Sequence, residues 1–514
     1  MQRKQLTLVI VSLLVVVLSV SLAWFTTQII GKGKNLNVSS ANLQIVFTDS
    51  DGALTETDIE PGWSATKTFT IKNDTKTEYK YNIVIKDLVN TFVTNGYLQY
   101  KITSTNNGYN MTEFKDIPKS SAPKDTILAY SVVIPNGVTQ SYTIEFKYAN
   151  DESVDQSDDM GKKLSGTLFI TEGTEPTLLT QLLADKSTVL TRTDFNTVLT
   201  NDNTNTLYTS TEDSKTVYYF AGNATDNWVK FGKNASNQDL YWRIIRTNSE
   251  GSIRLLYHGT STTATDAYIG KSAFNETYDD PMYVGYMYGT SGSLVNNRTN
   301  TTNSTIKGVI DTWYKNNLNT NYGKYISTTA VYCNDRSNPA GGYNTGKTSF
   351  NYGARTRLDT YKTPTYDCTD TNDKFTVDTS TGNGKLTYPI ALMTADEVSF
   401  AGGLYANYNA NAWYFRNAKE GTLTTSSSST DASYSSTGST YWWLLSPFYW
   451  FGSSARASVF YVGGSSLPGF LGDYFVDGTR GVRPAVSLKS CVKTSGGDGS
   501  AGTPYTIEES TSGC

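Results

Sequence analysis

Short segments in which apolar and polar residues alternate set the strongest constraint on the fold of this chain. Between residues 35 and 172 they are separated by turn signals such as EPG and PNG, and they read LQIVF (43–47), TKTFTI (66–71), YNIVI (81–85), SYTIEF (141–146) and GTLFI (166–170). Alternation with a period of two predicts strands that bury one face. Several short strands at this spacing favour an immunoglobulin-like β-sandwich. We therefore expect a mainly β protein, with an α+β domain toward the C-terminus.

The N-terminus predicts export. Residues 5–31 carry no charge and are numerous enough to cross a bilayer as a helix. Arg3 and Lys4 precede this segment, which places the N-terminus in the cytoplasm and the rest of the chain outside. Small residues within it offer signal-peptidase sites, so the segment is either a cleaved signal peptide or a retained membrane anchor. Both alternatives predict the extracellular face of a Gram-positive type membrane or secretion.

Four cysteines agree with an oxidising compartment. Pairing Cys333 with Cys368 and Cys491 with Cys514 is the simplest of the three connectivities that four cysteines allow. A zinc site is the alternative, but the chain has no CxxC motif and its single histidine, His258, lies far from every cysteine in the sequence. We expect two disulfides and no metal.

The length of 514 residues suggests about three domains. Leucines at 178, 179, 182 and 183 predict a short helix that docks on a neighbouring domain, whereas residues 201–214 are rich in Asn and Thr and are not expected to pack. The expected organisation is a signal or anchor (1–31), a β-sandwich stalk (32–172), a linker with a short helix (173–215), a ligand-binding domain (216–490) and a C-terminal tail (491–514).

Three elements are predicted within residues 216–490. YWRIIR (241–246) and SIRLLY (252–257) alternate like the strands of a hairpin. Ser304 is placed to cap a helix with an apolar stripe. Thr394 and Glu397 have the spacing of a capping box, and Gly402 is placed to end that helix.

An aromatic interval near the C-terminus predicts a binding face. Residues 446–479 combine many aromatic residues with Ser and Gly, the mixture that antibody loops use. Asn is frequent up to Asn417 and absent afterwards, although loops rich in Gly and Ser usually contain it. The alternative is that these residues form the core of a strand-loop-strand unit. The expected contact residues are Phe448, Tyr449, Phe451, Ser453, Phe460, Tyr461, Ser465, Leu467, Phe470, Asp473, Tyr474, Phe475 and Asp477.

The first third of the chain resembles the camelysin/TasA family of exported Gram-positive surface and fibre proteins. The resemblance rests on AWFT (23–26) at the end of the hydrophobic segment, a PG turn before a strand that ends in IKN (71–73), and GTL (166–168) after a polar insertion. It implies a surface or fibre role and no catalytic residue.

Residues 216–490 resemble the formylglycine-generating-enzyme-like branch of the C-type lectin fold. The motifs that carry the resemblance are YWRIIR (241–246), CNDRS (333–337), MTADEV (393–398), YWWLLSP (441–447) and GVRPAV (481–486). In related proteins the interval between the last two motifs is diversified by a retroelement that mutates adenines. Replacement of the adenines in an AAY codon, which encodes Asn, cannot produce a codon for Lys, Glu, Gln, Met or Trp. Between residues 448 and 477, Trp450 is the one residue of that set.

Catalysis has little support in the sequence. A Ser/His/Asp triad would need His258, which reads as the end of a strand, and the catalytic cysteine pair of formylglycine-generating enzymes has no counterpart near GVRPAV. The calcium-dependent sugar motifs EPN and WND are also missing, so we expect neither an enzyme nor a cofactor.

The expected partners are protein or glycan ligands on other cells, phage or host, and the membrane through the N-terminal helix. The net charge of −4, without long runs of one sign, argues against nucleic acid. Two alternatives remain open: a fibre or pilus-like subunit that assembles through the β-sandwich, and a carbohydrate-binding lectin that is not diversified.

Overall fold

The computed structural model divides into two compact units, Met1–Pro176 and Thr177–Cys514. It describes residues 59–94, 96–186, 188–199, 203–410, 412–419, 432–465, 467, 469–510 and 514, and the backbone of four short stretches before residue 59. The predicted signal or anchor segment, 1–31, lies outside the described residues apart from the backbone of 28–29. Within the described part of the chain, no helix is long and apolar enough to cross a membrane. The predicted mainly β architecture is confirmed.

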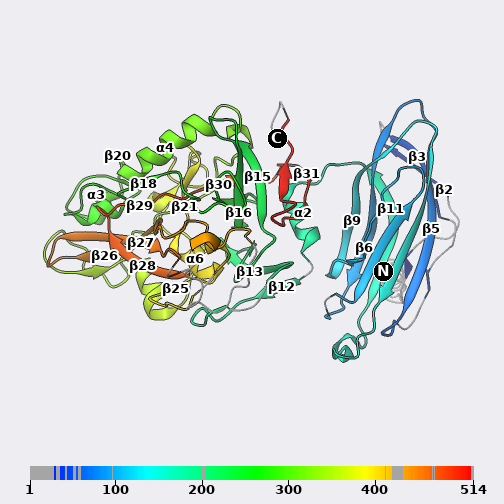
Figure 1. The fold of residues 1–514 in the computed structure, drawn as a ribbon, viewed down its shortest axis with the longest axis horizontal. Helices are drawn as coiled ribbons and strands as arrows, with labels where there is room; N and C mark the ends of the chain where they lie inside the picture. Colours follow the sequence, from blue (N-terminus) through cyan, green and yellow to red (C-terminus); the bar gives the residue numbers. More distant parts are fainter. Residues whose placement is uncertain are drawn as a thin grey trace, which may run out of the picture. The chain divides into compact units, whose positions relative to one another are not determined.

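The first unit consists of two sheets that share one core (Figure 1). One sheet has the order β4-β1-β11-β6-β9 and the other β2-β3-β5-β10-β7-β8. The elements are β1 Gln28–Ile29, β2 Asn35–Ser40, β3 Leu43–Asp49, β4 Leu54–Thr55, β5 Ser64–Asn73, β6 Tyr79–Asn90, β7 Leu98–Ser104, β8 Lys115–Asp116, β9 Ser120–Ile134, β10 Thr139–Tyr148, η1 Ser157–Asp159 and β11 Leu164–Glu172.

The alternating pattern explains how these sheets close on each other. Along β10, every second side chain is buried, including Tyr142, Ile144 and Phe146. Because successive side chains of a strand point to opposite faces, this pattern buries one face of each sheet and leaves the other in water. All five alternating segments of the sequence lie within strands of this unit.

The second unit is built on two larger sheets. The first has the order β12-β13-β14-β16-β15-β32-β31. β17 joins it by pairing with β16, β30 pairs with β17, and β24 pairs with β30. Its strands are β12 Thr188–Thr191, β13 Thr206–Glu212, β14 Lys215–Tyr219, β15 Trp228–Lys233, β16 Asp239–Thr247, β17 Ile253–Tyr257, β24 Ile390–Leu392, β30 Pro484–Leu488, β31 Thr494–Gly496 and β32 Tyr505–Ile507.

The second sheet of this unit has the order β18-β29-β26-β27-β28-β25, and β22 pairs with β26. Its strands are β18 Lys271–Ser272, β22 Phe350–Asn351, β25 Leu404–Tyr405, β26 Trp442–Phe451, β27 Arg456–Val462, β28 Phe470–Phe475 and β29 Arg480–Gly481, and two small ribbons pair β19 Met287–Tyr288 with β20 Thr302–Asn303 and β21 Tyr332–Cys333 with β23 Lys374–Phe375.

Helices and helical turns complete the second unit. They are α2 Leu178–Asp185, η2 Pro281–Val284, α3 Leu294–Asn297, α4 Thr305–Asn317, η3 Gly323–Tyr325, α5 Gly353–Arg355, η4 Thr356–Tyr361, η5 Thr371–Asp373, α6 Ala395–Ala401, η6 Trp413–Phe415 and η8 Ala432–Tyr434.

The local signals read from the sequence are confirmed. β16 and β17 form the predicted antiparallel hairpin. The Ser304 side chain caps α4 by accepting from the Lys307 amide. Thr394 and Glu397 form the capping box of α6, which ends at Gly402 with φ 115°. Both predicted disulfides, Cys333–Cys368 and Cys491–Cys514, are present.

Two predicted boundaries are wrong. The predicted helix is present as α2, and its Leu178 and Leu182 lie in the core of the second unit as expected, but the rest of the segment taken as a linker, 173–215, supplies β12 and β13 to the sheet of that unit. The segment taken as a tail, 491–514, supplies β31 and β32, and Tyr505 is fully buried beside β15. Both segments therefore cover apolar surface and sheet edges that the second unit would otherwise expose.

Candidate ligand-binding face

The aromatic interval folds into a three-stranded antiparallel meander, β26-β27-β28 (Figure 1). Its register pairs Phe451 with Arg456, and Ser458 with both Tyr449 and Phe475. On the other face of the meander, Tyr461 pairs with both Trp443 and Gly472. Since residues that pair across strands share a face, the register sorts the interval into two faces.

The motifs that flank the interval form its buried framework. Trp442, Trp443, Leu444 and Leu445 are at most 1% exposed. Residues 482–486 are equally buried, and β30 pairs with both β17 and β24 in the larger sheet. The meander is therefore anchored at both ends in the core of the unit.

An ionic network beneath the meander fixes α6 to the larger sheet. The Glu397 carboxylate accepts from Arg246 at 2.9 Å and from Arg254 at 2.6 Å, and all three side chains are nearly inaccessible to water. Burial opposes ionisation of Glu397, but the two arginines outweigh it and lower the pKa of this carboxyl. Arg246 also pairs with Glu212 at 2.8 Å, so two carboxylates balance the two arginines inside the core and the network is structural.

One face of the meander carries what we call the tyrosine strip, consisting of Tyr408, Tyr441, Tyr461, Phe470, Tyr474 and Arg480. Tyr441 stacks on Tyr461 with ring centroids 5.3 Å apart, and Tyr408 stacks on Phe470 at 5.2 Å. Tyr408 is 65% exposed and Tyr474 is 42% exposed. A contiguous set of rings that reaches the surface in this way is typical of an interaction site.

Gly472 allows the rings of the tyrosine strip to lie close to the backbone. A Cβ atom at this position would collide with the rings of Phe470 and Tyr461. The absence of a side chain on β28 therefore shapes the strip at its centre.

The opposite face carries what we call the phenylalanine strip, consisting of Tyr449, Phe451, Phe475, Arg355 and Arg456. The ring centroids of Tyr449 and Phe451 lie 4.5 Å apart, and those of Phe451 and Phe475 lie 5.3 Å apart. Arg355 stacks on Tyr449, and Arg456 stacks on Phe475. Both arginines are paired, Arg355 with Asp359 and Arg456 with Asp477. All five side chains of the strip are half-buried.

Asp473 lies on the same face as the phenylalanine strip, opposite Phe460 of β27. Burial raises the pKa of Asp473 to about 6, and Ser458 and Arg355 reduce the shift without cancelling it. The carboxyl therefore changes charge in mildly acidic solution.

Three predicted contact residues are wrong. Phe448 and Phe460 are at most 2% exposed and pack against each other and Tyr405, and Ser465 is 6% exposed. Phe460 shares a face of the meander with the phenylalanine strip, and it is buried because Phe448 and Tyr405 cover it there. The interval is thus partly core, as the alternative interpretation of the sequence had it.

The other predicted residues reach the surface to some degree. Tyr461, Phe470 and Tyr474 lie in the tyrosine strip, whereas Tyr449, Phe451, Asp473, Phe475 and Asp477 lie on or beside the phenylalanine strip. Ser453 is exposed at the tip of the β26-β27 hairpin, and Leu467 is half-buried in the β27-β28 loop. The structure therefore places the predicted residues on two opposite faces rather than on one.

Several residues of the two strips lie outside the predicted set. Arg480 and Tyr441 immediately flank the interval, and an interval widened by a few residues would have included them. Tyr408 and Arg355 come from distant segments, and nothing in their local sequence connects them with β26–β28.

The lone histidine belongs to the core. His258 is fully buried, with its ring edge-on to Trp228 and Arg483 donating to its Nδ1 at 3.2 Å. Burial, followed by the charges of Arg483 and Arg243, lowers the pKa of His258 well below its ordinary value. It is a neutral packing residue, as its sequence context indicated.

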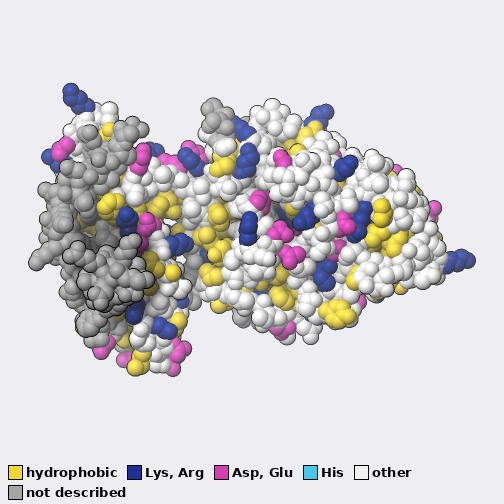
Figure 2. Space-filling model, turned by 180° about the vertical axis from the view of Figure 1, so that it is seen from behind, with side chains coloured by type: hydrophobic (Ala, Val, Ile, Leu, Met, Phe, Trp, Pro, Cys, Tyr) yellow, Lys and Arg dark blue, Asp and Glu magenta, His cyan; other side chains and the backbone are white. Residues whose placement is uncertain are grey.

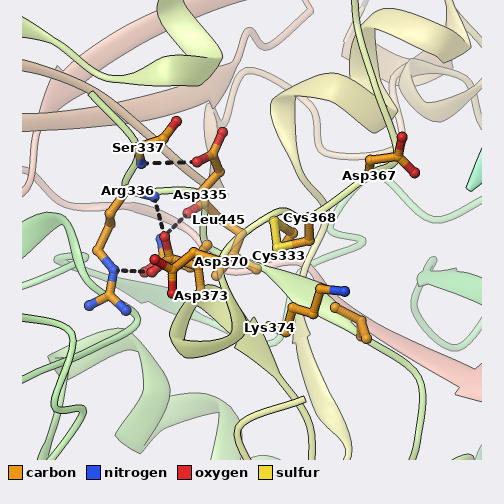
Figure 3. The surroundings of a disulfide bond; sticks show 12 residues. Cys333, Asp335, Arg336, Ser337, Asp367, Cys368, Asp370, Asp373, Lys374 and Leu445 are labelled. Atoms are coloured by element: carbon orange, nitrogen blue, oxygen red, sulfur yellow. Dashed lines mark hydrogen bonds and ion pairs between the residues drawn. A yellow bond between two sulfur atoms is a disulfide. The ribbon is translucent and has the colours of Figure 1, made fainter. Parts of the chain in front are cut away.

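A small polar pocket lies beside the Cys333–Cys368 disulfide. Its walls include Asp335, Arg357 and Asp396, and its volume of about 20 Å³ suits a single water molecule. Arg357 already bonds both carboxylates. Figure 3 shows the adjoining pairs of Arg336 with Asp373 and of Ser337 with Asp335. These contacts hold the CNDRS segment in place and leave no room for an organic ligand.

Charges of both signs are interspersed over the face of the second unit that Figure 2 shows, with small hydrophobic areas between them. Among the described residues, no group of three or more His, Cys, Asp or Glu side chains is arranged to hold a metal ion.

Residues 363–490 match a protein family described as a domain of unknown function, DUF6273. The match spans α6, the meander and β30, and it covers about a quarter of the chain. No curated protein and no solved structure matches the chain.

Proposed function

We propose that this protein is an exported bacterial surface protein that binds ligands through the meander β26-β27-β28 of its second unit. In this proposal the second unit is a C-type lectin fold of the formylglycine-generating-enzyme-like branch, and the interval 448–477 is diversified by a retroelement. The first unit is an immunoglobulin-like stalk, and residues 1–31 anchor or export the chain. The protein is not an enzyme.

One observation carries the proposal: the motifs that flank the interval are buried, whereas most of the candidate contact residues between them reach the surface. The YWWLLSP and GVRPAV motifs are buried apart from Tyr441 at the edge, whereas six of the nine aromatic side chains between residues 448 and 477 lie in the two strips that reach the surface. A site that tolerates substitution needs such a separation, because changes in a packed core cost several kcal/mol whereas changes at the surface cost little.

Sequencing the locus in many cells or sibling strains tests the proposal. We expect substitutions at positions whose side chains reach the surface, such as Tyr449, Tyr461 and Tyr474. The buried positions 448, 460 and 465 should vary far less. An even spread along the gene, or silent changes only, would contradict diversification and leave a fixed adhesin.

Assembly into a fibre through the first unit has weaker support. The edge strand β9 departs from regular pairing with β6 at several points, and Ser131 has a left-handed backbone with φ 50°. Pro123 and Lys124 lie in the exposed half of the same strand. Such features are typical of edges that resist pairing with another chain.

A further inference from the structure

Arg480 of β29 is the single charged residue of the tyrosine strip. Its guanidinium lies over the Tyr474 ring at 4.0 Å, and the rings of Tyr441 and Tyr461 are 5.8 Å and 5.9 Å away. A guanidinium carries its charge at every physiological pH and offers five N–H donors in a planar fork. The strip therefore presents a fixed positive charge among aromatic rings.

Arg480 differs from the arginines of the opposite face in having no carboxylate within ion-pairing distance among the described residues. Its Nη1 donates to the carbonyl of the adjacent Thr479, and its Nε is buried without a hydrogen-bond partner. Asp473, the nearest acidic residue on β28, points to the other face because it pairs with Phe460. The charge of Arg480 is stacked but not neutralised.

A carboxylate supplied by a ligand would complete this arrangement. Bidentate, charge-assisted bonds to guanidinium are among the strongest in proteins, and the surrounding rings reduce the competition from water. β26 and β27 have a paired strand on each side, so recognition on the tyrosine strip comes from side chains. Rings combined with an arginine are the composition of hot spots between proteins.

We propose that the tyrosine strip binds a segment of a partner protein that presents an Asp or Glu carboxylate to Arg480 and an apolar side chain to the neighbouring rings. The inference rests on the proposed function, because it assigns a ligand class to the same face. It goes further in predicting that acidic ligands are favoured whatever residues occupy the diversified positions, since Arg480 lies outside the interval 448–477.

Selection from a random peptide library displayed on phage, with the purified full-length protein as bait, tests this inference. We expect the selected peptides to be enriched in Asp or Glu next to an apolar residue. Replacing the acid by its amide in a synthetic peptide should weaken binding roughly 10- to 100-fold, the range for a hydrogen bond to a charged group. This measurement needs no protein variant, so it does not depend on whether a variant folds.

The variant Arg480→Gln should bind the acidic peptide more weakly by the same factor, and it should no longer distinguish this peptide from its amide. The four measurements complete a double-mutant cycle. Arg192→Gln is the matched control, because Arg192 is also a half-buried arginine stacked on an aromatic ring, 4.5 Å from the centre of Phe195. It lies outside the meander and should leave binding unchanged.

Different failures have different meanings. Peptides whose binding falls with Tyr474→Ala but not with Arg480→Gln would overturn the inference and leave the proposed function intact. Peptides that bind regardless of Tyr461→Ala and Tyr474→Ala in the tyrosine strip, and also of Tyr449→Ala and Phe475→Ala in the phenylalanine strip, would contradict both. Arg480-dependent binding of an oligosaccharide ending in glucuronic acid, without selection of acidic peptides, would assign the site to acidic sugars and overturn the proposed protein ligand.

Discussion

Replacing Asp473 by Asn should make the second unit more stable at neutral pH and remove part of its dependence on pH. In the folded protein, burial raises the pKa of Asp473 from its ordinary value of 3.8 to about 6. Below pH 4 the carboxyl is neutral in both the folded and the unfolded chain, so it contributes no penalty. Above pH 6 it is charged in both, and the folded state bears the cost of a charge held in partly apolar surroundings.

The size of the effect follows from the pKa difference. Between pH 4 and pH 6 the folded state binds more protons than the unfolded state, so the free energy of unfolding falls as pH rises. A difference of roughly two pH units corresponds to about 3 kcal/mol at 1.36 kcal/mol per unit. Asp473→Asn should therefore be more stable than the natural protein by up to this amount at pH 7.5, and the difference should shrink toward pH 4.

Urea unfolding followed by tryptophan fluorescence measures this difference. Seven of the nine tryptophans lie in the second unit, since Trp24 and Trp63 precede it. His258 acts in the opposite direction, because its lowered pKa costs stability as the pH falls below about 6.5. The difference between variant and natural protein cancels this contribution.

Asp279→Asn, which removes an exposed carboxylate of the same unit, controls for the loss of one negative charge. A stability difference for Asp473→Asn that stays constant from pH 4 to pH 7.5 would refute the reasoning. It would show that Asp473 is hydrated well enough to keep an ordinary pKa.

Three further predictions concern the scaffold and the face. Gly472→Ala should weaken binding of the selected peptides while changing the free energy of unfolding by less than about 1 kcal/mol, because the added methyl displaces the surface rings of Phe470 and Tyr461 rather than the core; equal affinity would contradict the close packing over Gly472. Glu397→Gln should destabilise the second unit by about 3–5 kcal/mol in urea unfolding, because it leaves Arg246 and Arg254 without their shared countercharge. The control Asp477→Asn removes the partner of the more exposed Arg456 and should cost less than about 1 kcal/mol. The double variant Cys333→Ser/Cys368→Ser opens a loop with a sequence separation of 35 residues, and its free energy of unfolding should fall by about 4 kcal/mol on the chain-entropy estimate. A urea midpoint equal to that of the oxidised protein would show that the pocket contacts hold the loop without the disulfide.

Local structure was readable from the sequence because its causes are local. The alternating segments of the first unit, the caps at Ser304 and Thr394, and the hairpin of β16 and β17 each depend on residues within a few positions of one another. The cysteine pairing also followed from proximity along the chain. The leucine spacing likewise predicted α2, whereas β12, β13, β31 and β32 owe their order to apolar surface and strand edges supplied by distant parts of the second unit, which leave no periodic signal in these strands.

The sequence by itself determined that residues 446–479 have the composition of a binding surface, and that the motifs on either side of them are apolar enough to serve as framework. Only the tertiary structure decided which of those aromatic residues reach the surface. The pairing of β27 with β26 and β28 places the neighbours Phe460 and Tyr461 on opposite faces, and the packing of Phe448 and Tyr405 buries Phe460 whereas Tyr461 stays partly exposed. The fold also brought Tyr408 and Arg355 to the meander and placed no carboxylate of the described residues within ion-pairing distance of Arg480. Facing depends on the register between strands and on what packs above them, and both are set by contacts between residues far apart in the chain.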